Sequence, residues 1–281
     1  MESDFYKLSI ALVTRNRSQN LKSAIESLKG QSIQPYEILV SDDSDIDSVI
    51  KQNIEICKSY NCIYFTGPRK GLYANRNFVA EKCNGSHIRT MDDDHEFPEN
   101  HLKECFDAIA RDPDAIWTIG EYCPPNEERS LPAPIPGQLH PKGYSCVPAD
   151  MNGYFGISCG ATIYPRSVIE SKVLNLETYK FGILYLEYGI RLKKNGFNIK
   201  HIQSTFVIHK SYATTASELQ NKTIEECRIF CMLMLTFKHQ VSIFNVYSTT
   251  SQLIFELIKG KISFRILLNA FEKYRLESSK M

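Results

Sequence analysis

The chain of 281 residues lacks the features that mark several common classes of protein. No apolar run approaches the roughly 20 residues that a membrane-spanning helix needs. The acidic start, Met1 to Asp4, lacks the basic and apolar pattern of a signal peptide, so we expect a cytoplasmic protein. With a formal net charge of only +1, the chain has no excess of basic residues, and we expect no nucleic-acid partner.

Cysteine pairs and glycine-rich loops are also missing where they would carry chemistry. The nine cysteines include no Cys-x-x-Cys pair, which argues against a zinc site and fits reduced thiols in the cytosol. No Gly-x-Gly-x-x-Gly follows an expected strand, which argues against a dinucleotide-dependent oxidoreductase. What remains is an ordinary globular composition, sufficient for one large domain or for one domain with an appendage.

Strand and helix patterns alternate through the first 120 residues. An amphipathic helix with Ser18 as its N-cap follows the first strand, and further helices are expected at 46–59 and 71–83. This order predicts an α/β fold with a mainly parallel sheet flanked by helices. Short apolar runs predict strands at 8–13, 36–40, 62–65, 86–91 and 115–119, and again at 160–164 and 206–208, with a helix at 182–194 between the last two.

Polar clusters follow three of these strands. They are Thr14 to Arg17 after the first strand, Ser41 to Ser44 after the second, and Asp92 to Asp94 after the fourth. In such sheets, ligands bind beyond the carboxyl ends of the strands. Adjacent carboxylates repel one another, and a divalent cation such as Mg²⁺ or Mn²⁺ is the simplest counter-charge, which could in turn hold a diphosphate. Helix capping by each cluster separately is the simpler alternative.

The pattern changes after residue 120. Residues 124–148 hold seven of the twelve prolines, which predicts a long irregular loop beside the active site, or a linker between domains. From 216 to 281 the pattern is helical, with basic residues among the apolar ones. Such helices can lie on an anionic membrane, here the inner face of the cell membrane, or can pack against the catalytic domain or a second subunit.

Five segments stand in a characteristic order along the chain: Val13–Arg17, Ser27–Gln31, Glu37–Ser44, Gly71–Asn77 with one extra residue, and Glu187–Leu192 followed by Gly196 and Phe197. Together with Asp92–Asp94, these segments resemble those of family 2 glycosyltransferases, whose fold is termed GT-A and whose Asp-x-Asp motif the triplet fits. The resemblance covers residues 8 to about 210. The resemblance implies one GT-A domain at 1–215, with a nucleotide-binding half at 1–120 and an acceptor half at 121–215, followed by a helical extension at 216–281.

The resemblance also implies roles for individual residues. Asp42 or Asp43 would contact the base or ribose of a nucleotide sugar, Arg76 would help to hold the nucleotide, and Asp92 would lie near the ribose. Asp94, with Asp92, would ligate Mn²⁺ or Mg²⁺. The remaining expected substrate contacts are Thr14, Arg15, Asn16 and Asp93. His209 would be a further metal ligand, or else a surface or packing residue.

The expected general base is where this chain departs from the family. Leu184 and Tyr185 stand where the family usually has Glu-Asp, six or seven residues before the helix arginine. A phenol is a poor base near neutral pH. We therefore expect Glu187 to face the cleft and act as the base, with Asp93 or Glu177 as alternatives, although Glu187 and Arg191 could instead form an i, i+4 ion pair.

The resemblance therefore implies a metal-dependent inverting glycosyltransferase. It would move a sugar from a nucleotide-diphosphate sugar to a glycan or lipid-linked acceptor, in surface polysaccharide synthesis. One alternative is a non-catalytic nucleotide-sugar-binding protein that has lost its base, supported by Leu184 and Tyr185. Another is a sugar nucleotidyltransferase, which would need a glycine-rich loop after the first strand, whereas residues 14–20 contain no glycine.

Overall fold

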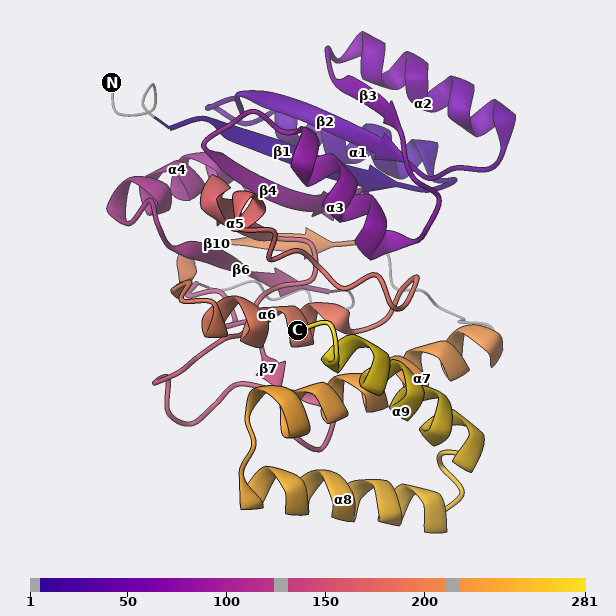
Figure 1. Cartoon of the computed structure of the whole chain (residues 1–281). Helices are drawn as coiled ribbons and strands as arrows, with labels where there is room; N and C mark the ends of the chain where they lie inside the picture. The colour runs from indigo at the N-terminus through magenta and orange to yellow at the C-terminus, as the bar shows by residue number, and fades with distance from the viewer. Residues whose placement is uncertain (1–5, 124–130, 211–217) are drawn as a thin grey trace.

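The computed structural model describes residues 6–123, 131–210 and 218–281 (Figure 1). The acidic start, the first two prolines of the proline-rich segment and the expected domain boundary at residue 215 lie outside the described residues. Within those three ranges, no helix is long and apolar enough to cross a lipid bilayer.

A mixed sheet of eight strands forms the centre of the molecule, in the order β3-β2-β1-β4-β9-β6-β10-β5. The pairs among β3, β2, β1 and β4 are parallel, as is β6 with β10, so the mainly parallel sheet is confirmed. β9 pairs antiparallel with both β4 and β6, and β5 pairs antiparallel with β10. The strands are β1 (Leu8–Thr14), β2 (Glu37–Asp42), β3 (Ile63–Thr66), β4 (His87–Asp92), β5 (His95–Glu96), β6 (Ile116–Tyr122), β9 (Thr162–Pro165) and β10 (Ile199–His209).

Helices cover both faces of this sheet. Alternate residues of β1 point to opposite faces, so Ile10 and Leu12 pack with residues of α1 while Ala11 and Val13 pack with residues of α3. All seven residues of β1 are buried, as the apolar run predicts for a central strand. The helices around the sheet are α1 (Ser18–Lys29), α2 (Asp47–Ser59), α3 (Leu72–Lys82), α4 (His101–Arg111), α5 (Arg166–Glu170) and α6 (Leu184–Lys194).

The register brings the three predicted polar clusters together. Thr14 at the end of β1 pairs with Asp42 on β2, and Val13 pairs with Asp92 on β4. The three strands therefore end at one level, which confirms the expected convergence. The expectation that Ser18 caps α1 is wrong, because Arg17 holds the cap position and Ser18 is the first helical residue, with a buried hydroxyl that has no partner among the described residues.

The C-terminal region is helical and lies below α6 in Figure 1. α7 (Glu218–Met234) continues into a π-helical turn, η1 (Leu235–His239), and is followed by α8 (Ile243–Ile258) and α9 (Phe264–Ser278). α7 and α9 pack together beneath α6, whereas α8 lies farthest from the sheet. The described part of the proline-rich segment carries a small hairpin of β7 (Gln138–Leu139) and β8 (Ser145–Cys146).

Candidate active site

A cavity of about 370 Å³ lies at the ends of β1, β2 and β4. Its wall includes backbone and apolar groups of Val13, Leu72 and Phe181. The charged side chains in the wall are four cations, Arg15, Arg17, Arg69 and Lys180, and three carboxylates, Asp43, Asp45 and Asp92. Cations of this kind can bind the oxygens of a diphosphate, so the cavity suits an anionic ligand.

Two arginines neutralise most of the charge of the Asp triplet. Arg76 is buried and donates from Nη2 to both oxygens of Asp92, each at 2.6 Å. Arg17 pairs with Asp93, and its Nη1 lies 3.0 Å from Asp94 Oδ2. The triplet therefore has counter-charges from the protein itself, in addition to any that a bound metal would supply.

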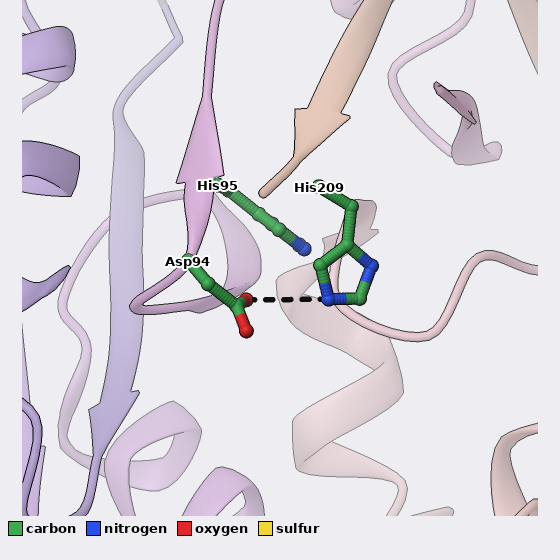
Figure 2. A group of neighbouring side chains, drawn as sticks. All are labelled: Asp94, His95 and His209. Carbon is green, nitrogen blue, oxygen red and sulfur yellow. Dashed lines mark ion pairs between the residues drawn. The ribbon is translucent and has the colours of Figure 1, made fainter. Parts of the chain in front are cut away.

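Asp94, His95 and His209 form the one group of potential metal ligands found among the described residues. Figure 2 shows their side chains pointing toward one another, Asp94 from the β4–β5 turn, His95 from β5 and His209 from the end of β10. One donor atom of each lies within 4.8 Å of the others, and His209 Nε2 is 3.3 Å from Asp94 Oδ1. His95 was not predicted, although it directly follows the Asp triplet.

A second carboxylate holds His209 from the other side. Glu121 Oε2 lies 3.4 Å from His209 Nδ1. The two carboxylates raise the pKa of His209 to about 11. Burial would raise the pKa of Asp94, but His209 and Arg17 lower it to about 2. His209 is thus a cation at neutral pH in the metal-free protein, and a metal at this position would have to displace its proton.

Several buried atoms here have no partner among the residues described. Both ring nitrogens of His95 and Oε1 of Glu121 are examples. Gly160 leaves room beside them, because a Cβ there would come within 2.8 Å of Asp92 Oδ2 and 2.9 Å of His95 Cε1. Unsatisfied buried acceptors are costly, so the residues present fit a bound cation. A carboxylate with two imidazoles suits Mn²⁺ better than Mg²⁺, which prefers oxygen ligands.

The acidic pair after β2 separates into two environments. Asp42 is buried and already bonded, accepting from Ser44 N, Asn53 Nδ2 and Tyr64 OH. Asp43 lines the cavity and accepts from Arg69 N at 2.8 Å. Burial raises the pKa of Asp43. Of the two, only Asp43 is positioned to meet a ligand in this cavity.

Of the other predicted substrate contacts, some line the cavity and others contact only the residues of its wall. Thr14 and Arg15 line the cavity, whereas Asn16 hydrogen-bonds Asp45 from its side chain. Asp93 has a fully buried side chain that accepts from Thr14 Oγ1 at 2.6 Å. Burial raises the pKa of Asp93 to about 7 despite the neighbouring Arg17. Asn16 and Asp93 therefore support residues of the cavity wall.

The prediction that Glu187 faces the cleft is wrong. Its side chain is fully buried, and Arg191 Nε lies 3.1 Å and His239 Nε2 2.8 Å from Glu187 Oε1. Burial alone would raise the pKa of Glu187, but Arg191 and His239 lower it. α6 packs on α7 and η1 through this side, so Tyr185, two residues earlier, is the residue that reaches a pocket.

We expect Glu187 to contribute to stability because it is the partner of a largely buried arginine. Glu187→Ala should lower the free energy of unfolding by about 3 kcal/mol, since Arg191 would lose its carboxylate. Chemical denaturation would measure this. Glu81→Ala removes an exposed partner of Lys172 and should leave the midpoint nearly unchanged. Equal stability of the two variants would contradict a structural role for Glu187.

Several residues of the site were not predicted from the sequence. Arg17 was visible in the cluster after the first strand but received no role. Arg69 lies in a short basic stretch before Gly71, which could have suggested an anion contact. Lys180 reaches the cavity because its carbonyl accepts from Leu72 N at 2.7 Å, a long-range contact without a local sequence signal.

Two curated bacterial proteins match part of this chain. A Bacillus subtilis (strain 168) protein, the uncharacterized glycosyltransferase YwdF, is 30% identical over 35% of this chain and 36% of its own length. GalNAc(5)-diNAcBac-PP-undecaprenol beta-1,3-glucosyltransferase of Campylobacter jejuni subsp. jejuni serotype O:2 (strain ATCC 700819 / NCTC 11168) is 34% identical over 32% of this chain and 30% of its length. The match therefore spans about a third of each relative.

Solved structures and a family model complete the comparison. GalNAc-T7 with UDP, GalNAc and Mn²⁺ superposes with a TM-score of 0.67 and 15% identity, over 83% of this chain and 48% of that one. S. aureus TarS 1-349 with UDP-GlcNAc gives a TM-score of 0.63 and 13% identity, over 95% and 80%. These likenesses support a GT-A fold. The model named glycosyl transferase family 2 matches residues 9–171, more than half of the chain, so the chain belongs to that family.

Proposed function

We propose that the chain is a metal-dependent inverting glycosyltransferase that uses a nucleotide-diphosphate sugar. The observation that carries the proposal is the cavity at the ends of β1, β2 and β4, which contains four basic side chains and lies next to the group of Asp94, His95 and His209. The acceptor would be a glycan or a lipid-linked glycan in surface polysaccharide synthesis. The name of the Campylobacter relative, which contains an undecaprenol-linked substrate, supports the lipid-linked choice.

Two parts of the chain would bind the two substrates. Residues 1–120 would bind the nucleotide, with Asp43 and Thr14 toward the base and ribose and with Arg15, Arg17, Arg69 and Lys180 toward the phosphates. Residues 121–215 would bind the acceptor, in a second cavity of about 240 Å³ that includes Glu121 and Tyr185. Residues 216–281 would be a helical extension. UDP is a reasonable first nucleotide to test because the GalNAc-T7 and TarS structures contain UDP or UDP-GlcNAc.

Asp94, His95 and His209 would hold the metal, with Mn²⁺ the better fit. When bound, the ion would neutralise charge that develops on the departing nucleoside diphosphate. Glu121 would fix the orientation of the His209 ring, as a carboxylate commonly does for a metal-binding histidine. Asp92 would act through Arg76, whose guanidinium already holds both of its oxygens.

Glu121 is the carboxylate best placed to be the general base. Glu187 is buried elsewhere, and burial raises the pKa of Tyr185, so neither suits proton removal at neutral pH. Glu121 lines the second cavity, and its Oε1 has no partner among the described residues. The acceptor oxygen would bond to the anomeric carbon as the bond to the diphosphate breaks, and Glu121 would take the acceptor's proton.

Donor hydrolysis with a panel of nucleotide sugars tests this proposal. We expect one nucleotide sugar to be hydrolysed slowly in Mn²⁺, and EDTA to stop the reaction. Calorimetry with the corresponding nucleoside diphosphate should show binding that weakens when the metal is removed. If the panel gives neither hydrolysis nor metal-dependent binding, the chain does not use a nucleotide-sugar donor in this way.

A further inference from the structure

α8 turns six of its apolar side chains away from the protein. Ile243 is 92% exposed, Ile258 78% and Tyr247 72%. Phe244, Ile254 and Phe255 are exposed as well. These six residues fall on one side of the helix, three in its first half and three in its last, with Ser251 between them on the same side, and together we call them the α8 apolar face.

The opposite side of α8 is buried, and beside Leu253 and Leu257 it carries several polar side chains. Thr249 Oγ1 lies 2.6 Å from Thr236 Oγ1 and donates to the carbonyl of Pro141 at 2.8 Å. Glu256 is buried and pairs with Arg228. Asn245 is also buried and donates to the carbonyl of Gln240 at 2.7 Å. These hydrogen bonds fix which side of the helix meets the body of the protein, because turning it over would leave buried polar groups unpaired.

This arrangement differs from that of a helix that packs on a protein in water. Such a helix buries its apolar side and exposes its polar side. An exposed apolar surface of this kind indicates a membrane or another protein as its neighbour. α8 lies farthest from the sheet, at the lower edge of Figure 1, so a flat surface can approach it without meeting the sheet.

The charges near α8 indicate whether its neighbour is a membrane or another protein. Lys259, Lys261 and Arg265 are exposed at the end of α8 and the start of α9, and both lysine ammonium groups lie within 6.0 Å of the centre of the Phe255 ring. The only acidic residue from 240 to 271 is Glu256, which is buried and paired. A second copy of the chain would offer these cations no carboxylate from the same face, whereas an anionic lipid surface would offer many.

We propose that the α8 apolar face lies in the headgroup region of an anionic phospholipid membrane, with Lys259, Lys261 and Arg265 contacting lipid phosphates. The helix would lie in the plane of the surface rather than cross it. Thr249 and Glu256 would connect the bound helix to Pro141 and Arg228, and so to the proline-rich segment that also lines the acceptor cavity. Binding to lipid does not depend on the proposed sugar transfer, so the two can fail separately.

Vesicle flotation without any nucleotide sugar tests the membrane contact. The full chain should float with vesicles of equal parts phosphatidylglycerol and phosphatidylcholine, and less with phosphatidylcholine alone. Replacing Ile243, Tyr247, Ile254 and Ile258 together with serine should lower the bound fraction by about tenfold or more. Lys259→Gln with Lys261→Gln should weaken binding to the anionic vesicles only.

Matched controls distinguish membrane binding through the α8 apolar face from nonspecific adsorption to vesicles. Tyr36→Ser and Ile54→Ser also remove exposed apolar side chains, but from the sheet end of the molecule, and should float as the unchanged chain does. Tyr247→Trp adds a reporter to a chain whose one tryptophan, Trp117, is buried. Brominated phosphatidylcholine in the anionic vesicles should quench the new tryptophan, because the ring would lie among the upper acyl chains.

Two results would overturn the proposal. One is a chain that stays unbound, or that floats equally with and without the four serine substitutions. The other is a dimer, detected by analytical ultracentrifugation, that the same four substitutions convert to a monomer while no lipid is bound. That result would assign the α8 apolar face to a second copy of the chain.

Discussion

Replacing Asp94 with alanine is expected to abolish Mn²⁺-dependent transfer while leaving the fold intact. Asp94 is the one carboxylate in the group with His95 and His209, so its loss removes the only anionic ligand. If the ion supplies several kcal/mol of stabilisation to the leaving group, transfer should fall by roughly 10³-fold or more. In this variant Arg17 would still form its ion pair with Asp93, and His209 would still form its ion pair with Glu121. Few buried charges would therefore be left without a partner.

Calorimetry would separate loss of the metal from loss of the nucleotide. Asp94→Ala should bind the nucleoside diphosphate equally with and without Mn²⁺, at the weak metal-free affinity. Asp107→Ala is a matched control, because it removes an exposed carboxylate whose partner is Lys103 on the surface of α4. If Asp94→Ala retains the full enhancement by Mn²⁺, the metal is held elsewhere.

The strand ends could be predicted from the sequence because their signal is local. A buried strand reads as an apolar run, and the polar residues that follow it must lie at the carboxyl edge of a parallel sheet. Thr14, Asp43 and Asp92 were found in this way, and the structure brings all three to one cavity. What periodicity does not contain is the order of strands, so the insertion of antiparallel β9 between β4 and β6 was not foreseen.

The error over Glu187 has a long-range cause. Helical spacing showed that Tyr185 and Glu187 point in different directions, but it could not show which direction is the cleft. That choice depends on His239, which lies 52 residues later and reaches back from η1 to Glu187. A carboxylate four residues before an arginine fits a buried ion pair as well as a catalytic site.

The orientation of α8 also could not be predicted from helical spacing alone. Leu253, Ile254, Leu257 and Ile258 indicate an apolar stripe, and such a stripe is normally placed against the core. In the structure Leu253 is buried, whereas Ile254 and Ile258 are exposed. The polar partners that decide the orientation, Pro141 and Arg228, come from distant segments.

Glu121→Gln is expected to reduce kcat by about 10²-fold or more, because an amide cannot accept the acceptor's proton. The substitution keeps the size of the side chain, so the cavity shared with Tyr185 should keep its shape. Donor binding, measured by calorimetry, should be unchanged at saturating Mn²⁺. Glu121 also lies 3.4 Å from His209 Nδ1, so the affinity for Mn²⁺ should fall by about 10- to 100-fold.

Those two effects can be separated by the metal concentration. If Glu121 only positioned His209, raising Mn²⁺ to saturation would restore transfer in Glu121→Gln. If Glu121 is the base, the loss in kcat persists at every Mn²⁺ concentration. Tyr185→Phe changes the neighbouring side chain without touching a carboxylate, and should keep kcat within about tenfold of the unchanged enzyme, since a phenol of raised pKa is not the base. Full recovery of Glu121→Gln by Mn²⁺, or a dead Tyr185→Phe, would remove Glu121 from the role of general base.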